Sequence, residues 1–162
     1  MGREIERKFL VSGDAWRAEA AERAPMSQGY IARSDRNSVR VRLAGERAWL
    51  NIKSGGLVAS RHEFEYAIPP ADARELLDLA IGPLIVKTRH LVPFGGFEWE
   101  VDEFHGANQG LVVAEIELDD ERQEFPRPAW IGAEVTHLER YYNVKLVKHP
   151  YSEWTETERR GA

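Results

Sequence analysis

The 162-residue sequence contains no cysteine and no long apolar run. Without cysteine, neither a disulfide scaffold nor a thiolate zinc site can form, and a reducing compartment is compatible with the composition. No stretch approaches the roughly 20 apolar residues that a membrane-spanning helix requires. The first ten residues, MGREIERKFL, are charged and lack the apolar centre of a signal peptide. We therefore expect a cytoplasmic protein without a membrane partner.

Common nucleotide-binding and metal-binding motifs are also missing. The sequence has neither a P-loop nor a GxGxxG pattern, and its five histidines show no HxH or HExxH spacing. A net charge of −5 is unfavourable for binding nucleic acid, because affinity there comes from neutralising phosphates. The five tryptophans are not interleaved with a basic stripe that could stack bases. We predict no nucleic-acid partner, although a small anion could still bind where positive charges cluster.

Alternation of charged and apolar residues with period two runs through most of the chain and is typical of β-strands. Short strands separated by Gly- or Pro-containing turns indicate a sandwich or a barrel. Eight segments show the pattern: 4–9, 28–34, 39–43, 49–53, 61–66, 86–89, 97–102 and 114–118. Helices are predicted over 12–23, after a Ser12 cap, over 71–80, after Pro69-Pro70, and over 136–142.

On the polar face of these strands, charged residues recur at positions i and i+2, which lie about 6.6 Å apart along the strand. Two interpretations stand beside each other: a solvated face with cross-strand ion pairs, or faces that converge on one interior. Recurrence of these charged pairs on many strands favours a common interior. An eight-stranded barrel can provide it, because its interior is wide enough for one small ligand. The acidic runs are Glu4/Glu6, Glu63/Glu65, Glu98/Glu100/Asp102 and Glu115/Glu117, and the basic runs are Arg40/Arg42 and Lys87/Arg89.

A lumen with both signs of charge needs a ligand with both signs. Carboxylates offer the oxygen ligands that Mg²⁺ or Mn²⁺ prefers, and Arg and Lys bind phosphate oxygens. A divalent metal together with a polyphosphate satisfies both sets. Phosphoryl transfer asks the protein mainly for positioning and electrostatic stabilisation, so a nucleophilic triad is not required.

An ordered set of motifs resembles the CYTH domain, or triphosphate tunnel metalloenzyme, family. The set begins with EIERKFL at 4–10, whose ExExK pattern is the family's hallmark. It continues with RVR (40–42), NIK (51–53), RHEFEY (61–66), KTRH (87–90), WEVDEF (99–104), VAEIEL (113–118), EVT (134–136) and YYN (141–143). The resemblance implies a single tunnel domain over residues 1–149, followed by a polar C-terminal tail, 150–162, whose last eight residues, TETERRGA, we expect to be frayed.

The fold that this resemblance implies is α+β and mainly β, an eight-stranded antiparallel barrel with a charged lumen and flanking helices. It also implies residue roles. The implied metal ligands are Glu4, Glu6, Asp102, Glu115 and Glu117. The implied substrate-binding residues are Lys8, Arg40, Arg42, Lys53, Arg61, Lys87 and Arg89. The implied catalytic residues are Lys8, Lys87, Glu63, Glu65 and Tyr30.

Some of these assignments leave alternatives open. Arg61 could bind phosphate or pair with an acidic neighbour, and Tyr30 could lie near the terminal phosphate or serve packing alone. Glu63, Glu65 and Asp102 could bind a second metal, tune lysine protonation or orient water. A homodimer is also open, because some tryptophans could cover a contact between copies.

The predicted activity is Mg²⁺- or Mn²⁺-dependent hydrolysis of inorganic tripolyphosphate to pyrophosphate and phosphate. Hydrolysis of thiamine or nucleoside triphosphates, and cyclisation of ATP as in class IV adenylate cyclases, are the enzyme alternatives. A module that binds triphosphate or polyphosphate without turnover is the alternative of another class. A lumen of purely structural ion pairs is disfavoured, since desolvation offsets much of the attraction in buried pairs.

Overall fold

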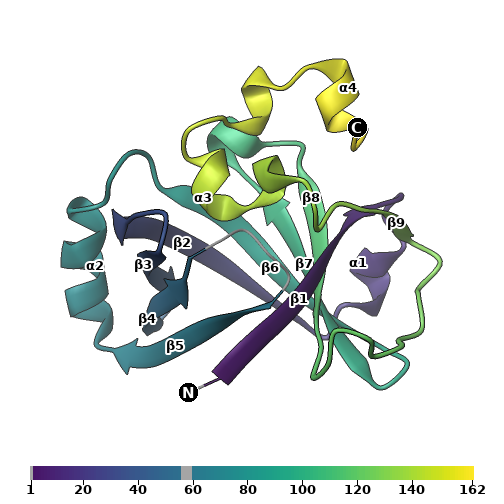
Figure 1. Cartoon of the computed structure of the whole chain (residues 1–162), viewed down its shortest axis with the longest axis horizontal. Helices are drawn as coiled ribbons and strands as arrows, with labels where there is room; N and C mark the ends of the chain where they lie inside the picture. The colour runs from purple at the N-terminus through teal and green to yellow at the C-terminus, as the bar shows by residue number, and fades with distance from the viewer. Residues whose placement is uncertain (1, 56–59) are drawn as a thin grey trace.

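The computed structural model describes residues 2–55 and 60–162, with side chains described for 5–55 and 61–162. Within these ranges, nine strands form one antiparallel sheet in the order β5-β4-β3-β2-β6-β7-β8-β1-β9 (Figure 1). The strands are β1 (Gly2–Val11), β2 (Glu22–Arg33), β3 (Asn37–Ala44), β4 (Arg47–Ser54), β5 (Ser60–Ile68), β6 (Ile85–Phe94), β7 (Phe97–Phe104), β8 (Val112–Glu117) and β9 (Ile131–Glu134).

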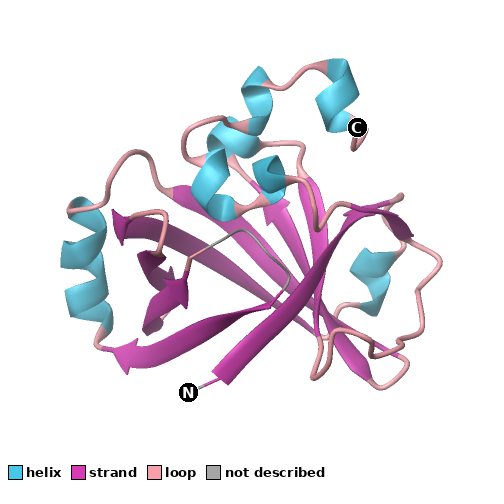
Figure 2. Cartoon of the chain, in the orientation of Figure 1, coloured by secondary structure: helices cyan, strands magenta, loops and turns pink. Residues whose placement is uncertain are grey.

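Strand β1 joins the two ends of the sheet. Its first residues, Gly2 to Ile5, pair with β5, and its later residues, Glu6 to Leu10, pair with β8. The eight strands therefore form a ring in the order β1-β5-β4-β3-β2-β6-β7-β8, which confirms the predicted antiparallel barrel. Strands appear as the dominant element around this ring, with helices at its periphery (Figure 2).

The ninth strand, β9, was not predicted. It continues along the edge of β1 beyond β5, where Val11 pairs with Ile131 and Phe9 with Glu134. Its sequence, IGAE, shows no alternation of charged and apolar residues, so this strand depends on its long-range partner. The Arg7 guanidinium also binds the Glu134 carboxylate across this edge.

The predicted helix over 12–23 is mostly wrong. Only α1 (Trp16–Glu19) is helical, and β2 begins at Glu22. Pairing of β2 with β6, from Glu22 opposite Leu91 onward, takes the last two residues of the segment that local pattern assigned to the helix. The helix predicted over 71–80 is confirmed as α2 (Pro70–Asp78), with proline at its first position as expected.

The helix predicted over 136–142 is also wrong, because helix α3 (Asn143–Leu146) begins only after that range. A short 3-10 turn, η2 (Glu139–Tyr141), precedes it, and η1 (Gly106–Asn108) and η3 (Tyr151–Glu153) are similar turns elsewhere. The C-terminal tail is ordered rather than frayed. Trp154 is buried against Tyr141, and α4 (Glu156–Arg159) is closed by a capping box between Thr155 and Glu158.

Apolar outer faces of the strands pack under the helices, as the alternation predicts. Val41 packs with α2, and Trp99 and Ile116 belong to a cluster that includes Trp16 of α1. Gly29 allows the end of α2 and the segment after it to approach β2, because an added Cβ would lie 2.8 Å from the Ala80 and Leu84 side chains and 3.4 Å from that of Leu77. This packing leaves the opposite faces to the lumen. In the described part of the chain, no helix has the length and apolar character needed to cross a membrane.

Candidate active site

A cavity of about 630 Å³ occupies the lumen of the ring, and its lining is mostly charged. It also reaches the turn between β2 and β3 and the helix α3. Most of the predicted site residues line it, namely Glu6, Lys8, Tyr30, Arg40, Arg42, Lys53, Arg61, Glu63, Glu65, Arg89, Glu115 and Glu117. Lys87 and Asp102 are buried beside it but are not part of its lining. Glu4 lies in β1, and its side chain is outside the described residues.

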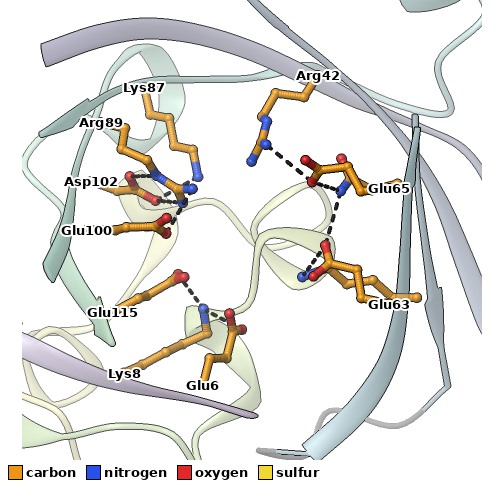
Figure 3. A network of polar contacts seen from close by, with 12 residues as sticks. Glu6, Lys8, Arg42, Glu63, Glu65, Lys87, Arg89, Glu100, Asp102 and Glu115 are labelled. Carbon is orange, nitrogen blue, oxygen red and sulfur yellow. Dashed lines mark hydrogen bonds and ion pairs between the residues drawn. The ribbon is translucent and has the colours of Figure 1, made fainter. Parts of the chain in front are cut away.

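Lys8 holds the acidic wall that β1 and β8 form. The strand register places Lys8 opposite Glu115 and Glu6 opposite Glu117. The Lys8 ammonium donates to Glu115 Oε1 at 2.5 Å and lies 3.4 Å from Glu6 Oε1 (Figure 3). Burial opposes the charged form of Lys8, but the carboxylates of Glu115 and Glu6 outweigh it and raise its pKa above the ordinary value. The Lys8 charge in turn lowers the pKa of Glu115 against the effect of burial.

Lys87 belongs to a second charged group, built by β6 and β7. Its ammonium donates to Asp102 Oδ2 at 2.6 Å. Arg89 binds the same carboxylate, with Nε 2.8 Å from Oδ1 and Nη2 2.9 Å from Oδ2, and pairs with Glu100 at 2.9 Å. Burial and then the Arg89 charge lower the pKa of Lys87 to about 8, although Asp102 opposes this. Burial opposes ionisation of Asp102, yet Arg89 and Lys87 lower its pKa.

Strands β4 and β5 carry a third group on the opposite side of the lumen from Arg89 and Asp102 (Figure 3). Asn51 is fully buried, and its amide donates to Glu63 Oε1 at 3.0 Å and to Glu65 Oε2 at 2.6 Å. Lys53 lies 3.7 Å from Glu63, and Arg42 lies 3.5 Å from Glu65. The Asn51 amide therefore fixes both carboxylates of the pair without adding charge.

Cations of β3 face the acidic wall across the cavity. Burial and the nearby charges of Arg40 and Arg89 lower the pKa of Arg42 to about 10, which leaves it charged at neutral pH. The Nε atoms of Arg40 and Arg42 are buried and, among the described residues, have no hydrogen-bond partner. Buried donors in this state favour an anionic ligand that would accept from them.

The remaining predicted residues also face the cavity. Arg61 donates to Glu6 at 3.0 Å, which is the predicted pairing with an acidic neighbour, and it also lines the cavity. Tyr30 is almost fully buried, and burial raises the pKa of its phenol. Its cross-strand neighbour is Arg40, so its hydroxyl belongs to the wall that carries the β3 cations.

The metal assignment rests on ligand chemistry. Glu6, Glu115 and Glu117 put carboxylates of one wall on two paired strands, and oxygen ligands suit Mg²⁺ or Mn²⁺. Among the side chains of 5–55 and 61–162, however, no three acidic or histidine groups gather around a single point, since Lys8 draws Glu6 and Glu115 to itself. The residue types therefore fit a divalent cation, and the arrangement around Lys8 is that of ion pairs.

Sequence reasoning missed three residues of the site. Glu100 lies in a recognised acidic run but was given no role, and it lines the cavity beside Arg89. Asn51 follows the lumen alternation of β4 and could have been found from that pattern. Tyr142 lines the cavity from the C-terminal segment, and the incorrect helix prediction there concealed it.

Comparison with known proteins gives consistent matches. The model of the CYTH domain family matches residues 2–150. An inorganic triphosphatase of Acetivibrio thermocellus is 49% identical over 157 residues, which cover 96% of this chain and 100% of the relative. A crystal structure of an inorganic triphosphatase is 32% identical, with a TM-score of 0.64 over 91% of this chain and 95% of that one. A protein of Pyrococcus horikoshii shares the fold at 17% identity, with a TM-score of 0.59 over 74% and 80% of the two chains.

Proposed function

Because this chain belongs to the CYTH domain family, we propose that it is a metal-dependent triphosphatase that hydrolyses inorganic tripolyphosphate to pyrophosphate and phosphate. The observation that carries the proposal is the cavity, whose walls combine paired carboxylates with buried arginine donors. The identity of 49% to an inorganic triphosphatase over nearly the whole chain supports the same reaction.

We assign the phosphate oxygens to the cations of the cavity wall. Arg40 and Arg42 offer guanidinium donors from β3, and Lys53 and Arg61 add charge from β4 and β5. Lys8 and Arg89 face them from β1 and β6. Guanidinium groups bind phosphate in a bidentate manner, so this set can hold a chain of phosphoryl groups in one orientation.

We assign the divalent cation, Mg²⁺ or Mn²⁺, to Glu6, Glu115 and Glu117, and we add Glu4 from its place two residues before Glu6 in the sequence. When bound, such an ion would stabilise negative charge on phosphoryl oxygens. Asp102 was expected among the ligands, but both of its oxygens accept from Lys87 and Arg89. We therefore propose that Asp102, itself bound by Lys87, holds Arg89 in place from behind the cavity wall.

We assign the orientation of the attacking water to Glu63 and Glu65, with Tyr30 near the terminal phosphate. Asn51 bridges the two carboxylates through one amide nitrogen and leaves each with acceptor capacity toward the cavity. In the reaction, the water oxygen forms a bond to the terminal phosphorus while the bridging P–O bond breaks. Pyrophosphate leaves with the bonding electron pair, and the proton released by the water passes to a carboxylate or to solvent.

The test is phosphate release by the purified protein from tripolyphosphate, ATP and thiamine triphosphate, each with Mg²⁺ and with Mn²⁺. We expect release from tripolyphosphate with either metal and much slower release from the two organic triphosphates. Glu117→Gln should reduce turnover by about 100-fold or more, the scale of losing one electrostatic group in an active site. Glu98→Gln is the matched control, because Glu98 is exposed on β7 and outside the cavity lining, and it should keep normal turnover.

The other outcomes point to the alternatives. Thermal stabilisation by tripolyphosphate without any product would favour a binding module, and cyclic AMP formed from ATP would favour a cyclase. Absence of phosphate release with both metals would contradict the proposal. The cytoplasmic location, the lack of a nucleic-acid partner and the homodimer remain predictions from composition.

A further inference from the structure

The Tyr142 ring lies on the cavity wall between two cations of the site. Lys8 Nζ is 4.8 Å from the ring centroid, and Arg61 Cζ is 5.6 Å from it. Both distances fall within the roughly 6 Å range at which an aromatic face attracts a cation. The Tyr142 side chain is almost fully buried, and such attraction is stronger where the groups are removed from water.

The segment that carries Tyr142 also fixes the backbone of Lys8. The Lys8 amide donates to Thr136 Oγ1 at 3.0 Å, and the Val135 amide donates to the Lys8 carbonyl at 2.8 Å. The Tyr142 hydroxyl closes this arrangement by donating to the Thr136 carbonyl at 2.8 Å. The ring therefore has a fixed place relative to the strand from which Lys8 projects.

The ring supplies an attraction that differs from that of the acidic partners. Glu115 and Glu6 bind the Lys8 ammonium directly, and Glu6 also binds Arg61. A phosphate that uses these cations must compete with carboxylates for them. The face of a phenol ring draws the cations through its quadrupole without a net negative charge, so it can fix their direction and leave their charge available.

The adjacent Tyr141 provides a natural contrast. Its ring packs on Trp154, with 4.9 Å between centroids, and its hydroxyl donates to the Glu158 carbonyl at 3.1 Å. Tyr141 belongs to the apolar cluster under the C-terminal helices and is absent from the cavity lining. Of these two neighbouring tyrosines, Tyr141 thus packs in the apolar core and Tyr142 lies at the charged site.

We propose that Tyr142 is a positioning residue that orients the side-chain cations of Lys8 and Arg61 in the cavity through the face of its ring. The proposal rests on the proposed function, since these two cations are assigned there to the phosphate chain. It places the action in the ring, and it gives the hydroxyl only the task of fixing the ring on Thr136. Removal of the ring should therefore matter more than removal of the hydroxyl.

The experiment measures binding of tripolyphosphate by calorimetry in the presence of a chelator, where no turnover occurs, together with KM and kcat in the presence of Mg²⁺. Tyr142→Leu should weaken binding about 10-fold, the scale of one to two desolvated cation–π contacts. Tyr142→Phe should stay within about twofold of wild type. Tyr141→Leu is the matched control, which should lower the melting temperature and leave the affinity of the folded protein unchanged.

The outcomes separate the two proposals. Wild-type affinity in folded Tyr142→Leu, or an equal loss in Tyr142→Phe, would overturn the assignment to the ring while the proposed function stands. If wild-type protein neither binds nor hydrolyses tripolyphosphate, the proposed function and this inference both fail. If Tyr142→Leu does not fold, Tyr142→Met replaces it, and the same comparison with Tyr142→Phe decides.

Discussion

Lys8 and Lys87 both enter the ring as buried ammonium groups bound to carboxylates, from β1 and β6 respectively. Lys8 has two carboxylate neighbours, Glu115 at 2.5 Å and Glu6 at 3.4 Å. Lys87 has Asp102 at 2.6 Å and shares it with Arg89. Burial alone would lower the pKa of both lysines, yet the pKa of Lys8 is raised and that of Lys87 falls to about 8.

The contrast shows that the local ratio of charges decides the state of a buried lysine in this lumen. The group around Lys8 has an excess of negative charge and lines the cavity, where a phosphate or metal could exchange with its partners. The group around Lys87 has two cations on one carboxylate. Lys87 and Asp102 lie behind the cavity wall, and Arg89 reaches its lining. We interpret the first group as a ligand-binding wall and the second as its internal support.

The largest expected effect concerns the internal support around Lys87 and Asp102. In Asp102→Asn the carboxylate that neutralises Lys87 and Arg89 is lost: the buried Lys87 amine keeps only an amide beside it, and Arg89 keeps only its ion pair with Glu100. Removing one partner of a buried pair costs roughly 3–5 kcal/mol, and the free energy of unfolding should fall by that order. Urea denaturation of the metal-free protein at pH 7 measures it.

The control for Asp102→Asn is Glu103→Gln on the neighbouring position of β7. Glu103 points to the outer face, where Arg17 binds it near solvent. A surface pair of this kind is worth about 0–1 kcal/mol, so the loss should be small. Equal losses in the two variants would remove the distinction between a buried support and a surface pair.

The sequence predicted which side chains share the lumen, because facing depends only on the two-residue period of a strand. Lys8, Lys87, Arg89 and Asp102 all fall on the predicted faces, and the eight strands that carry these faces are present. The apolar residues that alternate with these charges, Trp99 among them, follow the same rule and pack on the outer face. The barrel and the chemical character of its interior were therefore accessible from local pattern.

The partners within the lumen were not accessible in this way. Lys8 and Glu115 are 107 positions apart, and only the register of β1 on β8 brings them together. The sharing of Asp102 between Lys87 and Arg89 likewise depends on how β6 and β7 pair. Tertiary contacts also override weak local propensity in two of the predicted helices. The first is shortened to α1, and the wrong helix over 136–142 left Tyr142 without a predicted role in the site.

A second prediction uses the opposite pKa displacements of the two lysines. Between pH 8 and pH 10.5 the unfolded chain keeps the proton that Lys87 has lost in the folded protein, so folding stability rises with pH. At roughly 1.4 kcal/mol per pH unit, Lys87 should contribute a rise of about 3 kcal/mol across this window. The stability of wild type relative to Lys87→Met, measured by urea denaturation at a series of pH values, should rise accordingly.

Lys8→Met is the comparison variant for the pH series. The folded protein keeps the Lys8 proton above pH 10.5 while the unfolded chain loses it, so the Lys8 contribution to stability should decline there as pH rises. The two difference curves should therefore slope in opposite directions and in different windows. Parallel curves would mean that the lysines share one electrostatic state, and the comparison would be wrong.

The smallest expected effect concerns Glu100, the second carboxylate beside Arg89. Its ion pair with Arg89 is 2.9 Å long, but more than a third of its side chain is exposed. In Glu100→Gln, Arg89 keeps both contacts to Asp102, so we expect a loss below about 1 kcal/mol at pH 7. The pH-dependent rise assigned to Lys87 should begin at slightly lower pH, because one nearby negative charge is gone. A loss as large as that of Asp102→Asn would instead make Glu100 the main counter-ion of Arg89, and the support would extend to the cavity wall itself.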